Sequence, residues 1–167
     1  MMKTPICETC TKTKTLCSGC EKKLLEGAIS DHDIRISRLL SKFAEDHPSL
    51  EKADFYKALD FDKIVIVLTR GDVGLLIGKK GRVVTEISKE LGKKIRIAEF
   101  SGDLRKTVND IVIPARVDGI NVIYKDGEEA YKVKFNRVEA RKLPVDTQTL
   151  EKAFKKLFEK QVVVRVE

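Results

Sequence analysis

Residues 72–98 read DVGLLIGKKGRVVTEISKELGKKIRIA, and two glycines enclosing two lysines stand near the centre of this stretch. The pattern predicts a short helix ending at Ile77, a tight loop at residues 78–81 and a second helix over residues 82–91. Residues 94–98 then return as a strand. The unbroken apolar run IVIVL at residues 64–68 predicts another strand upstream, in the middle of a sheet or covered on both faces.

The residues of this loop are suited to holding a phosphate backbone. Gly78 and Gly81 have no Cβ, so a sugar-phosphate chain can lie directly against them. The second helix begins immediately afterwards, and its free N–H groups and positive dipole end face the same place. Lys79, Lys80 and Arg82 add positive charge there. The loop therefore predicts a contact with nucleic acid.

Three alternative interpretations of the glycines are weaker. A P-loop needs four residues between its first glycine and Gly-Lys, but Gly74 leaves only three before Gly78, and Lys80 stands where a hydroxyl is required. The dinucleotide-binding pattern G-x-G-x-x-G is absent. A simple turn between two helices is the remaining alternative, and it does not explain two adjacent lysines with flanking aliphatic residues.

The loop and its flanks resemble the KH family. Ile77, the GKKG loop and Val84 match the KH pattern of an aliphatic residue, GxxG and a second aliphatic residue. A predicted helix and two strands precede the loop, which gives the αββααβ order of bacterial-type (type II) KH domains; they lie near residues 30–46, 54–60 and 63–69. The segments 71–84 and 113–117 look particularly like archaeal NusA-like proteins, and the resemblance spans roughly residues 50–120.

This resemblance implies that the chain binds single-stranded RNA. In KH modules the GxxG loop clamps the backbone, and the bases of about four nucleotides rest in an adjoining groove with an apolar floor. The residues at matching positions, which we expect to bind RNA, are Ile77, Gly78, Lys79, Lys80, Gly81, Arg82 and Val84.

All four cysteines lie within the first 20 residues, as Cys7-x2-Cys10 and Cys17-x2-Cys20. Two such pairs complete a tetrahedral shell of four thiolates, which favours structural Zn²⁺ in a compact knuckle folded by its ion. Four thiolates leave no position for a catalytic water. Two disulfides are the alternative, although they are uncommon inside cells.

The second half of the chain resembles a KH domain that has lost its loop. Residues 117–124 and 130–136 read as strands of a hairpin, in which Tyr131, Val133 and Phe135 alternate with lysines. A helix capped by Asp146 or Thr147 and a strand at 162–166 follow. Where a second GxxG is expected, the chain instead reads EARKLPV, so this half is expected to act as a structural prop, a protein contact or a basic surface through Arg137, Arg141 and Lys142.

The expected fold class is therefore α+β with three parts. These are a four-cysteine zinc knuckle (1–27), a type II KH domain with GxxG (28–112) and a degenerate KH-like domain without it (113–167). The net charge of +7 favours an anionic partner, and it shifts from −2 over residues 28–77 to +4 over residues 78–120. No apolar run approaches the roughly 20 residues of a membrane span, and no secretion signal is evident, so we expect a cytoplasmic protein without a membrane partner.

The NusA resemblance implies a transcription elongation or termination factor that acts on single-stranded RNA with RNA polymerase. A factor for ribosome assembly, in contact with ribosomal particles, or for RNA turnover fits the residues equally well. A third hypothesis is an adaptor that binds protein through the zinc knuckle and the degenerate domain. No nucleophile and base, open metal site or inward carboxylate pair can be defended from the spacing, so we expect no enzyme.

Overall fold

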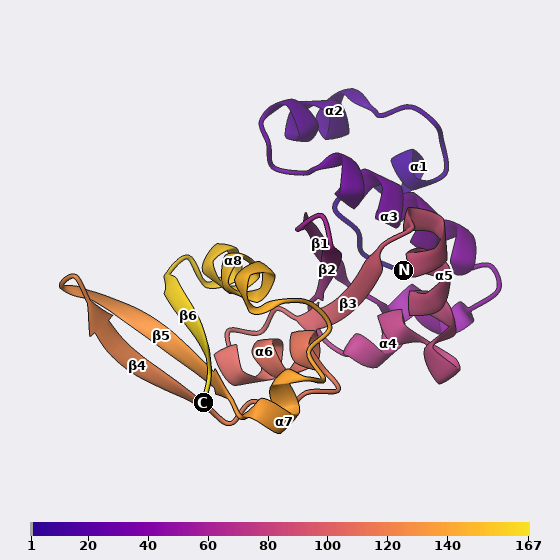
Figure 1. The fold of residues 1–167 in the computed structure, drawn as a ribbon. Coiled ribbons are helices and arrows are strands. Elements are labelled where there is room, and N and C mark those ends of the chain that lie inside the picture. Colours follow the sequence, from indigo (N-terminus) through magenta and orange to yellow (C-terminus); the bar gives the residue numbers. More distant parts are fainter. Residues whose placement is uncertain (1) are drawn as a thin grey trace. The chain divides into compact units, whose positions relative to one another are not determined.

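The computed structural model describes residues 2–167 and has an α+β fold with two separate three-stranded sheets (Figure 1). The chain forms two compact units, one ending at Ser101 and the other comprising Gly102–Glu167. Within the described residues, no helix is both long and apolar enough to cross a membrane.

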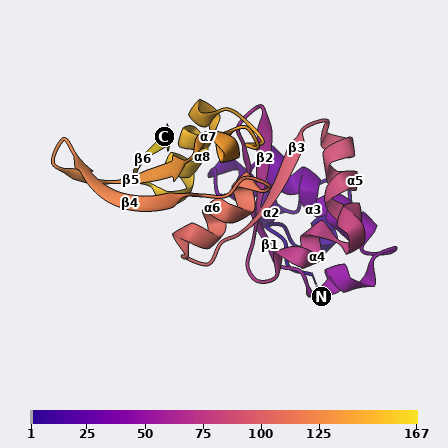
Figure 2. The ribbon, with the colours of Figure 1, turned by 60° about the horizontal axis from the view of Figure 1, so that its bottom comes forward.

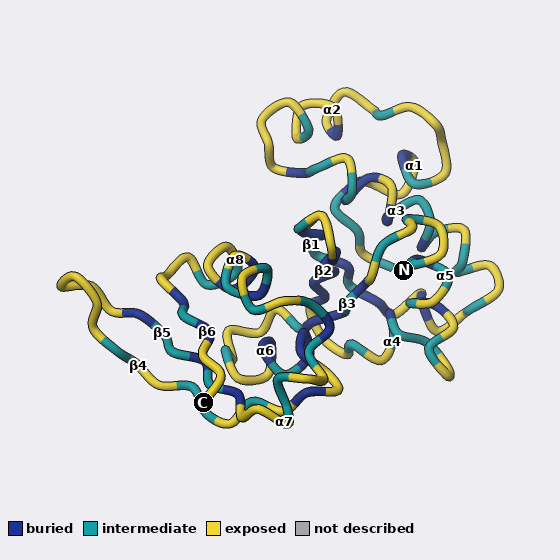
Figure 3. Tube along the Cα trace, viewed as in Figure 1, coloured by how far each residue is buried: buried dark blue, intermediate teal, exposed yellow. Residues whose placement is uncertain are grey.

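The sheet of the first unit has the strand order β1-β2-β3. Its strands are β1 (Phe55–Asp60), β2 (Ile64–Thr69) and β3 (Lys94–Glu99); β2 pairs antiparallel with β1 and parallel with β3. All six residues of β2 are buried, as the dark centre of Figure 3 shows, because a central strand is covered on both faces. The unbroken β-branched run therefore marks the middle of the sheet, as predicted.

The helices of this unit share one hydrophobic core with the sheet (Figure 2). They are α3 (Asp31–Phe43), α4 (Val73–Ile77) and α5 (Arg82–Leu91), with the 3-10 turns η1 (Pro48–Lys52) and η2 (Lys79–Gly81). Ile36, Leu76 and Ile87 contribute one fully buried side chain from each helix. The order α3, β1, β2, α4, α5, β3 is the αββααβ order expected from the sequence.

A capping box starts α3 and also joins it to the sheet. The Ser30 hydroxyl accepts a hydrogen bond from the Asp33 amide (3.2 Å), and the Asp33 carboxylate accepts one from the Ser30 amide (2.9 Å). The second oxygen of Asp33 accepts a hydrogen bond from the amide of Ala58 in β1 at 2.6 Å. Asp33 is 1% exposed, so this buried carboxylate fixes the start of α3 against the sheet.

The four-cysteine knuckle, residues 6–29, contains the short helices α1 (Glu8–Thr11) and α2 (Ser18–Leu25). Its own core is small: Ile6, Cys10, Cys20 and Ile29 pack with Ile34 of α3. Before it, Lys3 forms a parallel bridge with Asp54 beside β1. The knuckle therefore depends on α3 and on its cysteines for its shape.

The second unit repeats the same order of elements. It consists of α6 (Leu104–Val112), β4 (Gly119–Lys125), β5 (Glu128–Phe135), α7 (Arg137–Ala140), α8 (Thr147–Phe158) and β6 (Gln161–Val166). Strand β5 is central, antiparallel to β4 and parallel to β6. Val133 and Phe135 are buried while Lys132 and Lys134 stay partly exposed, as the predicted alternation requires, but Tyr131 is only partly buried.

The structure adds four short helices that the sequence patterns did not predict: α1 and α2 in the knuckle, and α6 and α7 in the second unit. Helix α6 lies with the second unit, so the units divide between Ser101 and Gly102, whereas the sequence placed the start of this domain at residue 113. The spacing of Val84, Ile87 and Leu91 predicts that these residues form the inward stripe of α5, and the structure differs. Val83 and Ile87 are buried, whereas Val84 and Leu91 are only partly buried.

Candidate nucleic-acid loop and metal centre

Helix α4 delivers the chain into the glycine loop. The Asp72 carboxylate caps its first turn by accepting a hydrogen bond from the Gly74 amide at 2.8 Å. Gly78 ends the helix with φ 79° and ψ 170°, a backbone conformation open almost only to glycine. Gly78 also packs against Val83, the buried residue in the first turn of α5. The first glycine of the loop is therefore required by both its conformation and its packing.

The loop then makes a left-handed turn into α5. Lys80 (φ 56°, ψ 26°) and Gly81 (φ 72°, ψ 18°) both adopt left-handed conformations, and the Gly81 amide donates to the Gly78 carbonyl at 3.1 Å. Gly81 is the N-cap of α5 and makes no side-chain cap. The positive end of α5 therefore faces the loop with no capping side chain in the way, a geometry that suits a phosphate group.

The structure brings the seven predicted RNA-binding residues together at this turn. Lys79, Lys80 and Arg82 line it, and none of the three forms an ion pair within the part of the chain that the structure describes. Ile77 and Val84 are half-buried beside them. The arrangement is a cationic rim next to partly exposed aliphatic side chains.

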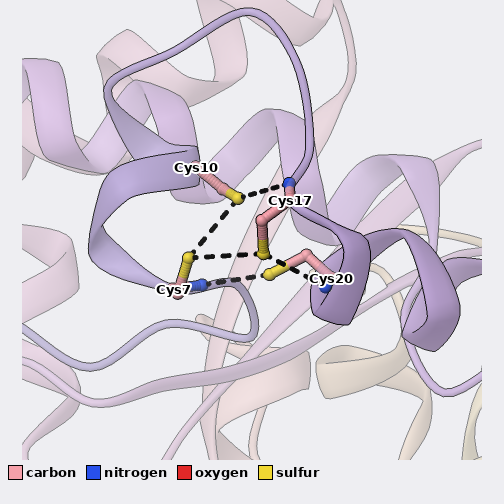
Figure 4. A group of neighbouring side chains, drawn as sticks. All are labelled: Cys7, Cys10, Cys17 and Cys20. Carbon is pink, nitrogen blue, oxygen red and sulfur yellow. Dashed lines mark hydrogen bonds between the residues drawn. The ribbon is translucent and has the colours of Figure 1, made fainter.

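The four cysteines converge as the spacing predicts (Figure 4). All four Sγ atoms lie within 4.8 Å of one another. The Sγ atoms of Cys7 and Cys10 are 3.4 Å apart, and those of Cys7 and Cys17 are 3.9 Å apart. A tetrahedral ion with bonds of about 2.3 Å to sulfur would separate its ligands by about 3.8 Å. All four cysteines are free thiols, so the disulfide alternative is not present in this structure.

Two helix N-termini hold the cysteines. Cys7 is the N-cap of α1 and Cys17 is the N-cap of α2, so Cys10 and Cys20 fall at the third helical position of each. Backbone amides donate to sulfur from Cys7 to Cys20 (3.4 Å), from Cys17 to Cys10 (3.1 Å) and from Cys20 to Cys17 (3.4 Å). These amides and the helix dipoles stabilise negative charge on the sulfurs.

The thiols differ in acidity. The amide of Cys20 donates to the sulfur of Cys17 and lowers the pKa of Cys17 to about 6. The Cys17 amide has the same effect on buried Cys10, but burial and the neighbouring sulfurs outweigh it and raise the pKa of Cys10 to about 12. Four thiolates at this distance repel one another and need a cation. The residues therefore fit a metal ion that prefers four sulfur ligands.

The second unit has no comparable loop between its two middle helices. The connection from α7 to α8 contains no glycine and includes Pro144. Instead, the Glu139 carboxylate accepts hydrogen bonds from the Arg116 amide (2.9 Å) and the Lys142 ammonium (3.2 Å). Arg137 and Arg141 are exposed beside it. The hydrogen bonds of the Glu139 carboxylate therefore stabilise this connection, which has no glycines against which a nucleic-acid backbone could lie.

Comparison with known proteins agrees with the class that the fold and the loop define. Residues 22–100 match the model of the NusA-like first KH domain. A segment of 61 residues is 38% identical to the probable transcription termination protein NusA of Methanococcus vannielii and covers 36% of this chain and 35% of that protein. A segment of 62 residues is 36% identical to the protein of the same name from Methanocaldococcus jannaschii and covers 37% of this chain and 34% of that protein.

A solved structure shares the fold over more of the chain. The crystal structure of APE1850 aligns with a TM-score of 0.54 and 24% identity, and covers 77% of this chain and 96% of that one. Residues 22–100 thus form a KH domain, the class of module that clamps single-stranded nucleic acid at a GxxG loop. The model that these residues match is that of the NusA-like first KH domain, and the match to the curated relatives spans about a third of their length.

Sequence reasoning did not single out two residues that shape the loop. Asp72 caps α4, and an Asp two residues before a glycine at the start of an apolar turn is a recognisable cap signal. Val83 fills the space under Gly78, and no local pattern distinguishes it from its neighbour Val84.

Proposed function

We propose that this protein binds single-stranded RNA at the GKKG loop. Gly78 and Gly81 let the backbone approach, Lys79, Lys80 and Arg82 neutralise its phosphates, and Ile77 and Val84 form part of the apolar floor under the bases. The observation that carries the proposal is the N-terminus of α5, which has no capping side chain and meets three cationic side chains that form no ion pair within residues 2–167. The function is binding without a catalytic step.

We propose Zn²⁺ as the ion of the four-cysteine site. Zinc forms closed tetrahedral sites with four thiolates in structural knuckles, and the sulfur spacing fits its bond length. Bound zinc would supply the charge that holds the four thiolates together. The small core of the knuckle makes such a contribution necessary for its stability.

The cellular role that fits best is a transcription elongation or termination factor of NusA type. The support is the NusA-like first KH domain and the name of the two archaeal relatives. RNA polymerase is the partner that this role requires. Recovery of RNA polymerase subunits with a tagged chain after nuclease treatment would support the role. Recovery of ribosomal particles alone would favour ribosome assembly instead.

The RNA-binding proposal is tested by titrating a short fluorescent RNA against the wild type and a Lys79→Asp, Lys80→Asp variant at several salt concentrations. The variant is expected to lose binding by at least about tenfold, and the slope of log K against log salt is expected to fall by about 1.4, or about 0.7 for each lost phosphate contact. The matched control is Lys155→Asp, Lys156→Asp, which changes two adjacent exposed lysines of α8. Equal binding by the GKKG variant and the wild type would contradict the proposal.

A further inference from the structure

Two open cavities lie where the four-cysteine knuckle meets α3, and none of the four cysteines lines either of them. The smaller has a volume of about 540 Å³ and the larger about 700 Å³. Three cationic side chains line both: Lys14 from the knuckle, and Arg38 and Lys42 from α3. The cavities are thus two sides of one cationic seam, which we call the Arg38 seam.

Arg38 is held in place at one end of its guanidinium group and is unpartnered at the other. Its Nε donates a hydrogen bond to the carbonyl of Cys10 at 3.2 Å. Its Nη2 atom is buried and has no hydrogen-bond partner within residues 2–167. A buried donor without a partner is costly in a folded protein. An anion in the seam would neutralise the charge of this guanidinium group.

The charge that lines the smaller cavity is strongly one-sided, whereas the larger cavity also contains the carboxylates of Glu8, Glu45 and Glu51. Four cationic side chains line the smaller cavity against a single carboxylate, that of Asp31; the four are Lys14, Arg35, Arg38 and Lys42. Neither Lys14 nor Lys42 forms an ion pair within the described part of the chain. By contrast, two other lysines of the knuckle form ion pairs, Lys12 with Glu8 and Lys22 with Glu26. The smaller cavity therefore carries an excess of positive charge.

The remaining lining of the smaller cavity is apolar, supplied by Leu16, Leu24, Ile34 and Leu39. A wall of aliphatic side chains next to several cations suits a nucleotide, whose base can rest on the apolar part while its phosphate meets the charge. A free inorganic anion would make no favourable contact with these aliphatic side chains.

The seam belongs to the same body as the GKKG loop. Arg35, which lines the smaller cavity, donates from its Nη2 to the carbonyl of Glu90 near the end of α5 at 3.0 Å. Helix α5 begins at the loop, and its 10 residues span about 15 Å. An RNA strand that leaves the loop can therefore reach the seam without any movement of the protein.

We infer that the Arg38 seam is a second contact for single-stranded RNA, in which Lys14, Arg38 and Lys42 bind a phosphate of the strand outside the nucleotides held at GKKG. The inference rests on the proposed function, because it adds a site to the same RNA. It gives the knuckle a role in binding: the zinc-held turn positions Lys14 and the Cys10 carbonyl opposite α3.

The test compares two RNA lengths. A strand of about four nucleotides fills the KH groove alone, and one of about twelve nucleotides also reaches the seam. The variant Lys14→Glu, Lys42→Glu is expected to weaken the longer RNA by at least about fivefold and to lower its salt slope by about 1.4, while affinity for the shorter RNA stays unchanged. The matched control is Lys22→Glu, Lys23→Glu, which makes the same charge change at exposed knuckle positions outside both cavities.

Two outcomes would overturn the inference: unchanged affinity of the seam variant for the longer RNA, or an equal loss in the control variant. Failure of the proposed function is separate, because it would show as unchanged four-nucleotide binding by the Lys79→Asp, Lys80→Asp variant. Zinc content and circular dichroism check that each variant is folded. If the glutamate variant loses zinc, Lys14→Gln, Lys42→Gln replaces it, and the same change in salt slope is expected because the same two phosphate contacts are lost.

Discussion

A Cβ atom placed on Gly78 would lie 2.6 Å from Cγ2 of Val83 and 2.9 Å from its backbone nitrogen. Backbone cannot move aside as a flexible side chain can, so the loop and the first turn of α5 are built around the missing side chain. Gly81 differs: a Cβ there would come no closer than 3.9 Å to any neighbour. Glycine is thus required at position 78 by packing and backbone conformation together, and at position 81 by its left-handed conformation alone.

This difference predicts unequal effects of two alanine substitutions. Gly78→Ala should cost about 3 kcal/mol, because it combines a glycine-only backbone conformation with a clash against Val83. Gly81→Ala should cost about 1 kcal/mol, the penalty of a left-handed conformation alone. The measurement is the shift of the urea midpoint of the first unit. Equal shifts would contradict this account of the loop.

Loss of the Asp33 side chain is predicted to lower the free energy of unfolding more than loss of the Ser30 hydroxyl, its partner in the capping box. Asp33→Ala removes the acceptor of the buried Ala58 amide as well as half of the capping box, and should cost about 3 kcal/mol. Ser30→Ala removes only the other half, and should cost about 1 kcal/mol. Urea unfolding followed by circular dichroism compares the two. A larger effect of Ser30→Ala would show that the link to β1 contributes little.

Removal of the metal is predicted to unfold the knuckle and leave the KH core in place. The knuckle core is small, whereas the KH core joins three helices and a sheet without any cysteine. A strong chelator should release one zinc per chain and broaden the amide signals of α1 and α2, with little change in β2. Acid should do the same as protons displace the metal from the thiolates. Loss of the β2 signals together with those of α1 would contradict this division.

Glu139 is predicted to make the second unit sensitive to acid. The Arg116 amide and then the Lys142 ammonium hold the pKa of Glu139 below its ordinary value of 4.5. A lowered pKa in the folded state stabilises the fold above pH 4.5, and this contribution is lost as pH falls through the lowered value. Glu139→Gln should therefore unfold more easily than the wild type at pH 7, and the gap should narrow on acidification. A gap that stays constant down to about pH 3 would argue against the role of the carboxylate.

Local patterns were sufficient for much of the fold. The run of β-branched residues in β2, the bounds of α5 between Gly81 and Gly92, and the spacing of the four cysteines all act within a few residues, so the sequence shows them directly. Helix α6 carried a usable signal: Asp103 caps it, and Val108, Ile111 and Val112 recur at helical spacing. It was missed because this segment was assigned to the end of the KH domain (28–112), with no element predicted for it.

Other features depend on contacts between distant residues. The four residues of α7 are too few to show a period. Arg38 meets the Cys10 carbonyl across 28 positions of the chain, and only the fold brings the two together. The burial of Val83 in place of Val84 depends on the angle at which α5 leaves the loop. The residues of the GKKG loop could be identified from the sequence alone, but those of the Arg38 seam could not.

The central claim is that RNA binds at the turn between α4 and α5, and amide chemical shifts test it most directly. A single-stranded RNA of about four nucleotides is added to the labelled, zinc-loaded chain, and the shifts of all amides are followed. The account predicts the largest changes at residues 77–84. Largest changes on strands β4 and β5, with residues 77–84 unaffected, would contradict it.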